Sequence, residues 1–292
     1  MPNSQCAPKM NTNYKKLTVK KPAFLGSCFS IDDLFKIIRE WNMLHPTNKI
    51  IHKNTHNIKQ IWNLIAAKLN TEDCNTEFCW IKKKLKNTKL ANNLIHNFRP
   101  EMPSTWHHNN TEWLSTEDID NVLLQYEEVF SEFTYRGAVP IDFDKVLYTN
   151  ECVSNDVCKI NLSKLSHRGK TKIGIVFNLD PHYKNGSHWI AMFIDINKKI
   201  LGYWDSYAMD PPTEIISLIT RLQKQSSKYF KSPLTIMHTN IRHQYKKSEC
   251  GMYCIHFITQ LLEGNSFNKV YKSIISDDEM NKKRQMFFNK SS

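Results

Sequence analysis

Residues 244–251 read QYKKSECG and stand directly before an apolar helical pattern. Beyond them, apolar side chains recur at the spacing of one helix face as far as Gly264: Cys254, Ile255, Ile258, Leu261 and Leu262. The pattern predicts a helix that begins at Cys250. A cysteine at a helix N-terminus lies at the positive end of the helix dipole, which favours the nucleophilic thiolate. Gly251 lets a backbone N–H approach a substrate carbonyl closely. Cys250 is therefore a candidate nucleophile, and simple space-filling by a lone cysteine is the alternative.

A candidate base and its partner lie upstream of Cys250. His188 begins a β-like run, and Asp205 ends the next one. A hairpin of this size can bring the start of one strand beside the end of the other, so that the carboxylate orients the imidazole. Gln244 can donate its side-chain amide to an oxyanion. The ordered set predicts a thiol hydrolase site. Asp195 is an alternative third member, although its place before a turn favours a turn-forming role.

Several motifs around these residues resemble one clan of cysteine peptidases. They are GSHWI at 186–190, WDS at 204–206, QYKKSECG at 244–251, EWLSTEDI at 112–119, TNIRHQ at 239–244 and ISDDEM at 275–280. The clan contains the SUMO-specific proteases and adenain. Within it, the chain most resembles the polyprotein-processing proteases of large DNA viruses, African swine fever virus among them. The resemblance covers residues 100–290.

The resemblance implies an α+β fold with a papain-like, SUMO-protease-type core, in which helices flank a central mixed sheet. It also implies the residue roles. They are a general base at His188, its orienting acid at Asp205, the nucleophile at Cys250 and an oxyanion donor at Gln244. Family members clamp a Gly-Gly segment of substrate between two aromatic side chains. Here Trp113 and Trp189 match those positions, and Gly251 adjoins the nucleophile; core packing is the alternative role of each tryptophan. Trp113 and Asp205 resemble the SUMO-protease branch rather than the viral one, which leaves the natural substrate open.

The expected reaction is thiolate attack on the peptide carbonyl after Gly-Gly, followed by hydrolysis of the acyl-enzyme. By resemblance, the expected substrate is a structural polyprotein or core precursor of a large DNA virus, cleaved during virion maturation. One alternative is the removal of ubiquitin-like modifiers. Another is a nucleic-acid-binding assembly protein on an inactive peptidase scaffold. A viral enzyme would lie in the virion core and host cytoplasm, and otherwise the protein would lie in an intracellular, reducing compartment.

The remaining sequence predicts an N-terminal helical, basic accessory domain over residues 1–99 and a catalytic domain over 100–292. Ser30 and Asp33 are a candidate N-terminal cap of one helix, and a second apolar stripe begins at Ile58. Within the catalytic domain, a capping box at 115–118 predicts a helix whose stripe runs to Phe133. Strands are expected at 173–179, 188–196, 200–204 and 235–239. Asp210-Pro211-Pro212 is expected to start a helix, with proline in its first turn, that runs to about Tyr229.

Charge and cysteine usage limit the classes of partner. The net charge is +12, from 40 Lys and Arg against 28 Asp and Glu. Either the bias of an AT-rich genome or an acidic partner such as nucleic acid explains this excess. The basic runs at 15–21, 82–84 and 282–284 are expected to be solvated, with nucleic-acid contact as the alternative.

The chain shows neither an apolar run of membrane-spanning length nor a signal peptide, so no membrane partner is expected. A reducing compartment predicts that the eight cysteines are free thiols. The cysteine pairs 74/79 and 152/158 are spaced too widely for a zinc knuckle, so neither a metal nor a cofactor is expected.

Overall fold

The computed structural model describes residues 5–10, 23–24, 26–52 and 57–290, so the basic run at 15–21 lies outside the described residues. The chain divides into two compact units. Unit 1 consists of Met1–Ser104 and Gln285–Ser292, and unit 2 consists of Thr105–Arg284. The boundary predicted at 99/100 precedes this division, and residues 285–292 fall in unit 1 rather than with the expected catalytic domain.

Unit 1 is built from short helices around a buried aromatic and aliphatic core. Helix α1 (Ile31–Leu44) begins at the capping box of Ser30 and Asp33, as predicted, and α2 (Ile58–Leu69) follows the second stripe. The remaining helical turns of this unit are η1 (Pro8–Met10), α3 (Glu77–Cys79), the π-helical η2 (Trp80–Lys84), α4 (Lys89–Leu94) and η3 (Ile95–Asn97). The Asn289 side chain donates to the carbonyls of Gln5 and Arg99, at 3.1 and 2.9 Å, so residues far apart in sequence close this unit.

Unit 2 is organised on a five-stranded mixed sheet in the order β1-β2-β3-β4-β5. Its strands are β1 (Phe133–Pro140), β2 (Lys172–Asn178), β3 (Trp189–Asp195), β4 (Ile200–Trp204) and β5 (Thr235–His238). The pairs β2/β3 and β3/β4 are antiparallel, whereas β1/β2 and β4/β5 are parallel. The antiparallel β3–β4 hairpin therefore lies at the centre of the sheet, where both of its faces are covered.

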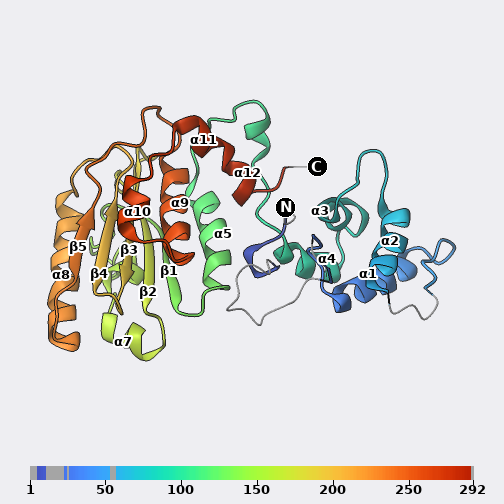
Figure 1. Cartoon of the computed structure of the whole chain (residues 1–292), viewed down its shortest axis with the longest axis horizontal. Coiled ribbons are helices and arrows are strands. Elements are labelled where there is room, and N and C mark those ends of the chain that lie inside the picture. The colour runs from blue at the N-terminus through green and yellow to red at the C-terminus, as the bar shows by residue number, and fades with distance from the viewer. Residues whose placement is uncertain (1–4, 11–22, 25, 53–56, 291–292) are drawn as a thin grey trace. The chain divides into compact units, whose positions relative to one another are not determined.

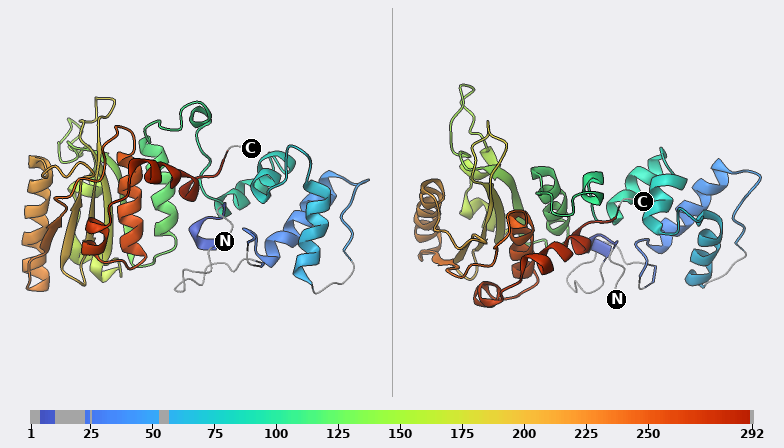
Figure 2. Two further views of the ribbon diagram at one scale, coloured as in Figure 1. Left: turned by 45° about the horizontal axis from the view of Figure 1, so that its top comes forward. Right: turned by 90° about the horizontal axis from the view of Figure 1, so that it is seen from above.

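Helices cover both faces of the sheet (Figures 1 and 2). One face packs its aliphatic side chains against α6 (Asn155–Cys158), α7 (Leu162–His167) and α8 (Thr213–Phe230). The other face carries α5 (Thr116–Glu127), α9 (Cys250–Leu262) and α10 (Phe267–Lys272). Gly202 permits this second packing, because a Cβ there would lie 2.1 Å from the Phe267 ring. The remaining helices are η4 (Ser104–His107), α11 (Asp277–Lys282) and α12 (Arg284–Phe287). The architecture confirms the predicted α+β class with a mixed sheet flanked by helices.

The helix predicted to run to Phe133 is wrong in its last turns. Helix α5 ends at Glu127, and Phe133 is the first residue of the edge strand β1. The apolar spacing of residues 129–133 fits both a helix face and the entry to a buried strand, so periodicity alone does not separate them. The other expected strands are present, with end residues that differ by at most one position. The helix expected from Asp210-Pro211-Pro212 begins at Thr213 instead, with Pro212 as its N-cap, and ends at Phe230.

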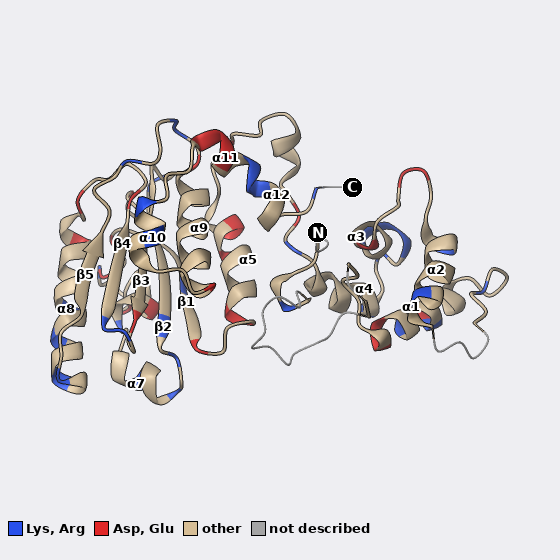
Figure 3. Ribbon diagram, viewed as in Figure 1, with Lys and Arg blue, Asp and Glu red and all other residues tan. Residues whose placement is uncertain are grey.

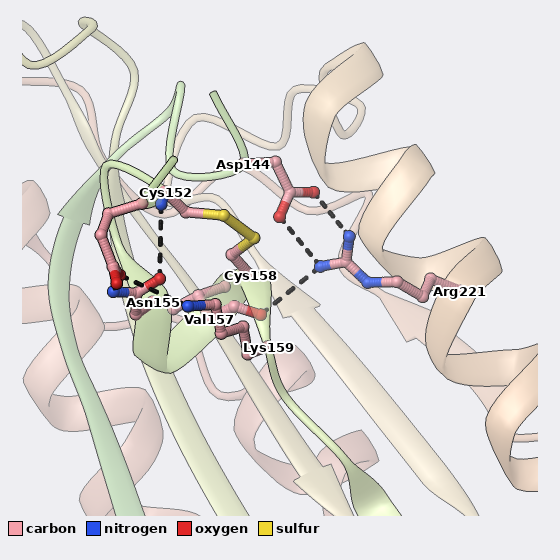
Figure 4. The surroundings of a disulfide bond; sticks show 8 residues. Asp144, Cys152, Asn155, Val157, Cys158, Lys159 and Arg221 are labelled. Carbon is pink, nitrogen blue, oxygen red and sulfur yellow. Dashed lines mark hydrogen bonds and ion pairs between the residues drawn. A yellow bond between two sulfur atoms is a disulfide. The ribbon is translucent and has the colours of Figure 1, made fainter. Parts of the chain in front are cut away.

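The prediction of free thiols is wrong for six of the eight cysteines. Disulfides join Cys6 to Cys28, Cys74 to Cys79 and Cys152 to Cys158, with Cα–Cα distances of 5.0, 5.5 and 6.4 Å. These separations lie in the range that a disulfide spans. The third bond closes the loop before α7, beside an ion pair between Asp144 and Arg221 (Figure 4). Only Cys250 and Cys254 keep free thiols.

The basic runs differ in their surroundings. Lys82 pairs with Glu101 and Lys83 pairs with Asp73, and the side chains of both lysines stay partly exposed. Arg284 contradicts the expectation of solvation because it is only 3% exposed. Among the described residues, Lys and Arg are distributed over many elements rather than concentrated on one (Figure 3). No described helix is both long and apolar enough to span a membrane.

Candidate active site

The β3–β4 hairpin brings His188 and Asp205 together, as the sequence predicts. His188 directly precedes β3, Asp205 directly follows β4, and the antiparallel register places these ends side by side. His188 Nε2 lies 2.8 Å from Asp205 Oδ1, and both side chains are buried. Asp195, the alternative partner, lies at the other end of β3. There its Oδ1 accepts from the backbone N–H of Lys198 at 3.0 Å, which is a turn-forming contact.

Helix α9 carries Cys250 to the same end of the hairpin because it packs against β3. The thiol of Cys250 interacts with the His188 ring closely enough to raise the pKa of the imidazole. Since Nε2 faces Asp205, Nδ1 is the ring nitrogen left for the sulfur. Burial acts to lower the pKa of His188. The hydrogen bonds to Asp205 and Cys250, together with their charges, outweigh burial and raise the pKa to about 9. The imidazole is therefore protonated at neutral pH and can act as a proton donor.

Asp205 and His188 are held by Tyr207, a residue that the sequence motifs did not single out. The backbone N–H of Tyr207 donates to Asp205 Oδ1 at 2.8 Å. Its ring stacks on His188, with 4.6 Å between centroids and 20° between planes. Within the described part of the chain, Asp205 Oδ2 is buried without a hydrogen-bond partner. A buried carboxylate with one unsatisfied oxygen is costly unless a charge faces it, so this environment favours the imidazolium form of His188.

Gln244 lies next to the triad, but its amide is engaged within the chain. Its Oε1 accepts from Ser206 Oγ at 2.6 Å, and its Nε2 donates to the Lys246 carbonyl at 2.7 Å and to Tyr207 Oη at 3.3 Å. Asp277 Oδ2 fixes the same loop by accepting from the backbone N–H groups of residues 245 and 246. This contact gives the ISDDEM motif a structural role that spacing alone does not reveal. Because α9 begins at Cys250, the N–H groups of its first turn have no intrahelical acceptor.

A groove of about 510 Å³ has Trp113 and Trp189 in its lining, with residues 138–140, 180–182 and 184–186 contributing to its walls. Trp189 is 5% exposed and donates from Nε1 to the Leu114 carbonyl at 2.9 Å, whereas Trp113 is 41% exposed. Gly251 adjoins this place, since a Cβ there would lie 3.0 Å from Leu114 Cβ and 3.3 Å from Trp189 Cδ1. The structure thus brings both predicted tryptophans to one groove and places Gly251 against Trp189.

Comparison with known proteins assigns the chain to a family. Residues 170–291 match the model of the Ulp1 protease family, C-terminal catalytic domain. The putative thiol protease R355 of Acanthamoeba polyphaga mimivirus is 30% identical over 283 residues, which cover 90% of this chain and 89% of that protein. The chain belongs to the Ulp1 protease family. It is therefore a cysteine peptidase, as predicted.

Other relatives agree with this assignment. The SUMO-1 cysteine protease S273R of African swine fever virus (isolate Pig/Kenya/KEN-50/1950) is 27% identical over 261 residues, covering 84% of this chain and 93% of that protein. The crystal structure of the African swine fever virus pS273R protease aligns with a TM-score of 0.66 and 22% identity, over 98% of this chain and 96% of the other. This likeness confirms the predicted protease fold together with its N-terminal helical region.

The nucleic-acid partner suggested by the net charge stays a prediction. In the part of the chain that the structure describes, no three His, Cys, Asp or Glu side chains gather as a metal-binding group.

Proposed function

We propose that this Ulp1-family peptidase cleaves after Gly-Gly in structural or core precursors during the maturation of a large DNA virus. The groove with Trp113 and Trp189 in its lining, beside Gly251 in the first turn of α9, carries this proposal. In this proposal the two indoles border a narrow passage, which admits backbone and the hydrogen side chain of glycine more readily than any larger residue. A substrate threaded through such a slot presents its Gly-Gly carbonyl to the start of α9.

The proposed chemistry follows from the positions of the four polar residues. Cys250 Sγ attacks the carbonyl carbon after Gly-Gly, and the carbonyl oxygen becomes an oxyanion. The imidazolium of His188, held by Asp205, gives its proton to the leaving amine as the C–N bond breaks. His188 then takes a proton from water, which attacks the thioester and releases Cys250. The products are a new carboxylate that ends in Gly-Gly and a new amine.

The oxyanion receives hydrogen bonds from the backbone N–H groups at the start of α9 and from Gln244 Nε2. For Gln244 to donate, its amide exchanges the bond to the Lys246 carbonyl or to Tyr207 Oη for one to the substrate. Substrate binding therefore includes a small rearrangement of the loop that Asp277 holds.

The choice of a viral precursor as substrate is supported by the viral relatives, a putative thiol protease of mimivirus and a cysteine protease of African swine fever virus. The second candidate function is the removal of a ubiquitin-like modifier. It is favoured by the name SUMO-1 cysteine protease that several of the African swine fever virus relatives carry. The two functions differ in whether the enzyme recognises an extended peptide or a folded domain that ends in Gly-Gly.

Cleavage of two substrates by the wild-type chain and by Cys250→Ala separates these functions. One substrate is an unstructured peptide containing Gly-Gly-Ala, and the other is a folded SUMO precursor with a tail after Gly-Gly. We expect Cys250-dependent cleavage of the peptide, with a higher kcat/KM than for the folded precursor. Preference for the precursor would transfer the protein to modifier removal. Cleavage of neither substrate, or equal cleavage by Cys250→Ala, would contradict the proposed site.

A further inference from the structure

A buried ion pair lies directly behind the candidate nucleophile. Glu249, the residue before Cys250, is 1% exposed, and Arg284 is 3% exposed. Arg284 Nε and Nη2 each lie 3.3 Å from Glu249 Oε2. The other carboxylate oxygen, Oε1, accepts from Ser248 Oγ and from Asn281 Nδ2, both at 3.0 Å. Both oxygens of Glu249 are thus held, one of them by a charged group that water does not screen.

The same guanidinium also reaches the segment that carries the exposed tryptophan of the groove. Arg284 Nη2 donates to the Glu112 carbonyl at 2.6 Å, and Glu112 directly precedes Trp113. Asn281 repeats this bridge one turn earlier, because its Nδ2 donates to the Asn110 carbonyl at 2.7 Å as well as to Glu249. Residues 281 and 284 therefore join the start of α9 to the segment before Trp113.

Arg284 also stands where the chain passes between its two units. Unit 2 ends at Arg284 and begins at Thr105, so the chain crosses between units beside each of these residues. Within unit 2, the Arg284 guanidinium stacks on the ring of Trp106, at 4.4 Å from its centroid. The start and the end of unit 2 in sequence are thus in contact through Trp106 and Arg284. The same guanidinium also bonds Glu249.

We propose that Arg284 is a positioning residue that sets the first turn of α9 and the segment before Trp113 in register with each other. This proposal rests on the proposed function of Cys250. Arg284 touches neither substrate nor the reacting atoms and acts through Glu249 and the Glu112 carbonyl. If the guanidinium is lost, Glu249 becomes an unpaired buried carboxylate next to the thiolate. Cys250 is then displaced or its thiolate disfavoured, and the groove loses its fixed relation to the nucleophile.

Arg284→Lys tests the geometry while keeping the positive charge. An ammonium is a compact point donor without the planar fork, so it cannot reproduce the bonds to Glu249 and to the Glu112 carbonyl together. The matched control is Arg221→Lys. Arg221 is also an arginine of unit 2 in an ion pair, with Asp144 at 2.8 and 3.1 Å, and it bonds the Val157 carbonyl (Figure 4). Among the described residues, none of its hydrogen bonds or ion pairs reaches the triad.

Two quantities are measured for the wild type, Arg284→Lys, Arg221→Lys and Cys250→Ala. The first is kcat and KM on the Gly-Gly-Ala peptide, and the second is the rate at which iodoacetamide alkylates Cys250, followed by mass spectrometry. Displacing a reacting group by a fraction of an ångström costs on the order of tenfold or more. For Arg284→Lys we therefore expect kcat and the alkylation rate to fall together by about tenfold or more. We expect Arg221→Lys to keep both rates, whatever it does to the midpoint of thermal unfolding.

Glu249→Gln combined with each arginine variant shows whether Arg284 acts through the carboxylate. If it does, Arg284→Lys adds little further loss of alkylation rate in the Glu249→Gln background. The proposal is overturned if Arg284→Lys lowers only thermal stability, as Arg221→Lys does, and leaves kcat and alkylation at wild-type values. Failure of the proposed function looks different, because the wild-type chain would then leave the peptide uncleaved, or Cys250→Ala would cleave it at the wild-type rate.

Discussion

The first two turns of α9 each present a free thiol, and the two thiols have opposite chemistry. Cys250 in the first turn faces His188, whereas Cys254 in the next turn is fully buried among core side chains. Burial, with added repulsion from the charges of Cys250 and Asp205, raises the pKa of Cys254 well above its usual value. Burial alone therefore makes a thiol inert. A buried thiol becomes a nucleophile when an imidazolium compensates its charge, and position along the helix decides which of the two has that partner.

Removing the two thiols in turn is the strongest test of this contrast. Cys250→Ala should lower kcat by roughly 10⁴-fold or more, because it deletes the nucleophile. Cys254→Ala removes one buried sulfur and should leave kcat within a few-fold while lowering the unfolding free energy by about 1 kcal/mol. Peptide hydrolysis and urea unfolding check both variants. A large loss of activity in Cys254→Ala with an unchanged fold would contradict the contrast.

Asp205→Asn removes the negative charge that helps to keep His188 protonated. We expect kcat to fall by roughly 10²–10⁴-fold, since an amide supports the imidazolium poorly. The pKa of His188 should fall from about 9, because the charge and hydrogen bond of Asp205 raise it. The high-pH limb of kcat/KM should therefore move to lower pH. An unmoved limb would show that another group sets it.

The same raised pKa has a consequence for stability in the wild type. A histidine whose folded-state pKa lies above its unfolded value stabilises the fold fully below the unfolded value of 6.5. That contribution is lost as pH rises through about 9. Urea unfolding at these pH values should show this loss in the wild type and a smaller one in Asp205→Asn.

Gly251→Ala addresses the space beside the first thiol rather than its charge. The added Cβ would press on Leu114 and Trp189, at 3.0 and 3.3 Å, and shift the side of the groove nearest the nucleophile. We expect kcat/KM to fall by about tenfold. The helix propensity of alanine, at most about 1 kcal/mol better than that of glycine, offsets part of the cost of these contacts, so the unfolding free energy should change little. Wild-type kcat/KM in this variant would show that substrate does not pass Gly251.

Tyr207→Phe is expected to have the smallest effect. It removes the hydroxyl that donates to the Lys246 carbonyl and accepts from Gln244, while the ring still stacks on His188. A lost bond of this kind is worth about 1 kcal/mol, so kcat should change by less than about tenfold. The pH limb assigned to His188 should stay in place. A moved limb would show that the hydroxyl, rather than the ring, supports the imidazole.

Much of unit 2 could be predicted from the sequence because its signals are local. The capping box at Ser115, the hairpin between residues 188 and 205 and the stripe after Cys250 each depend on residues close in sequence. His188 lies beside Asp205 because of the hairpin register, and the apolar pattern of the two strands and their short turn set that register.

The features that sequence analysis missed depend on partners distant in sequence. Arg284 reads as the end of a basic run until Glu249 is seen opposite it. A reducing compartment predicts free thiols, but whether cysteines pair also depends on which of them the fold brings together, and the sequence does not show this. The role of Asp277 in holding the backbone of residues 245 and 246 equally needs the tertiary structure.

The order in which the protein can assemble follows from the discontinuous make-up of unit 1. A chain emerging from the ribosome delivers residues 1–104 first, then all of unit 2, and only then residues 285–292. Asn289 ties the carbonyls of Gln5 and Arg99, so unit 1 acquires these contacts only after unit 2 has been synthesised. The N-terminal part of unit 1 therefore lacks its C-terminal contacts throughout the synthesis of unit 2. Unit 1 completes its folding late, after the sheet of unit 2 can already have formed.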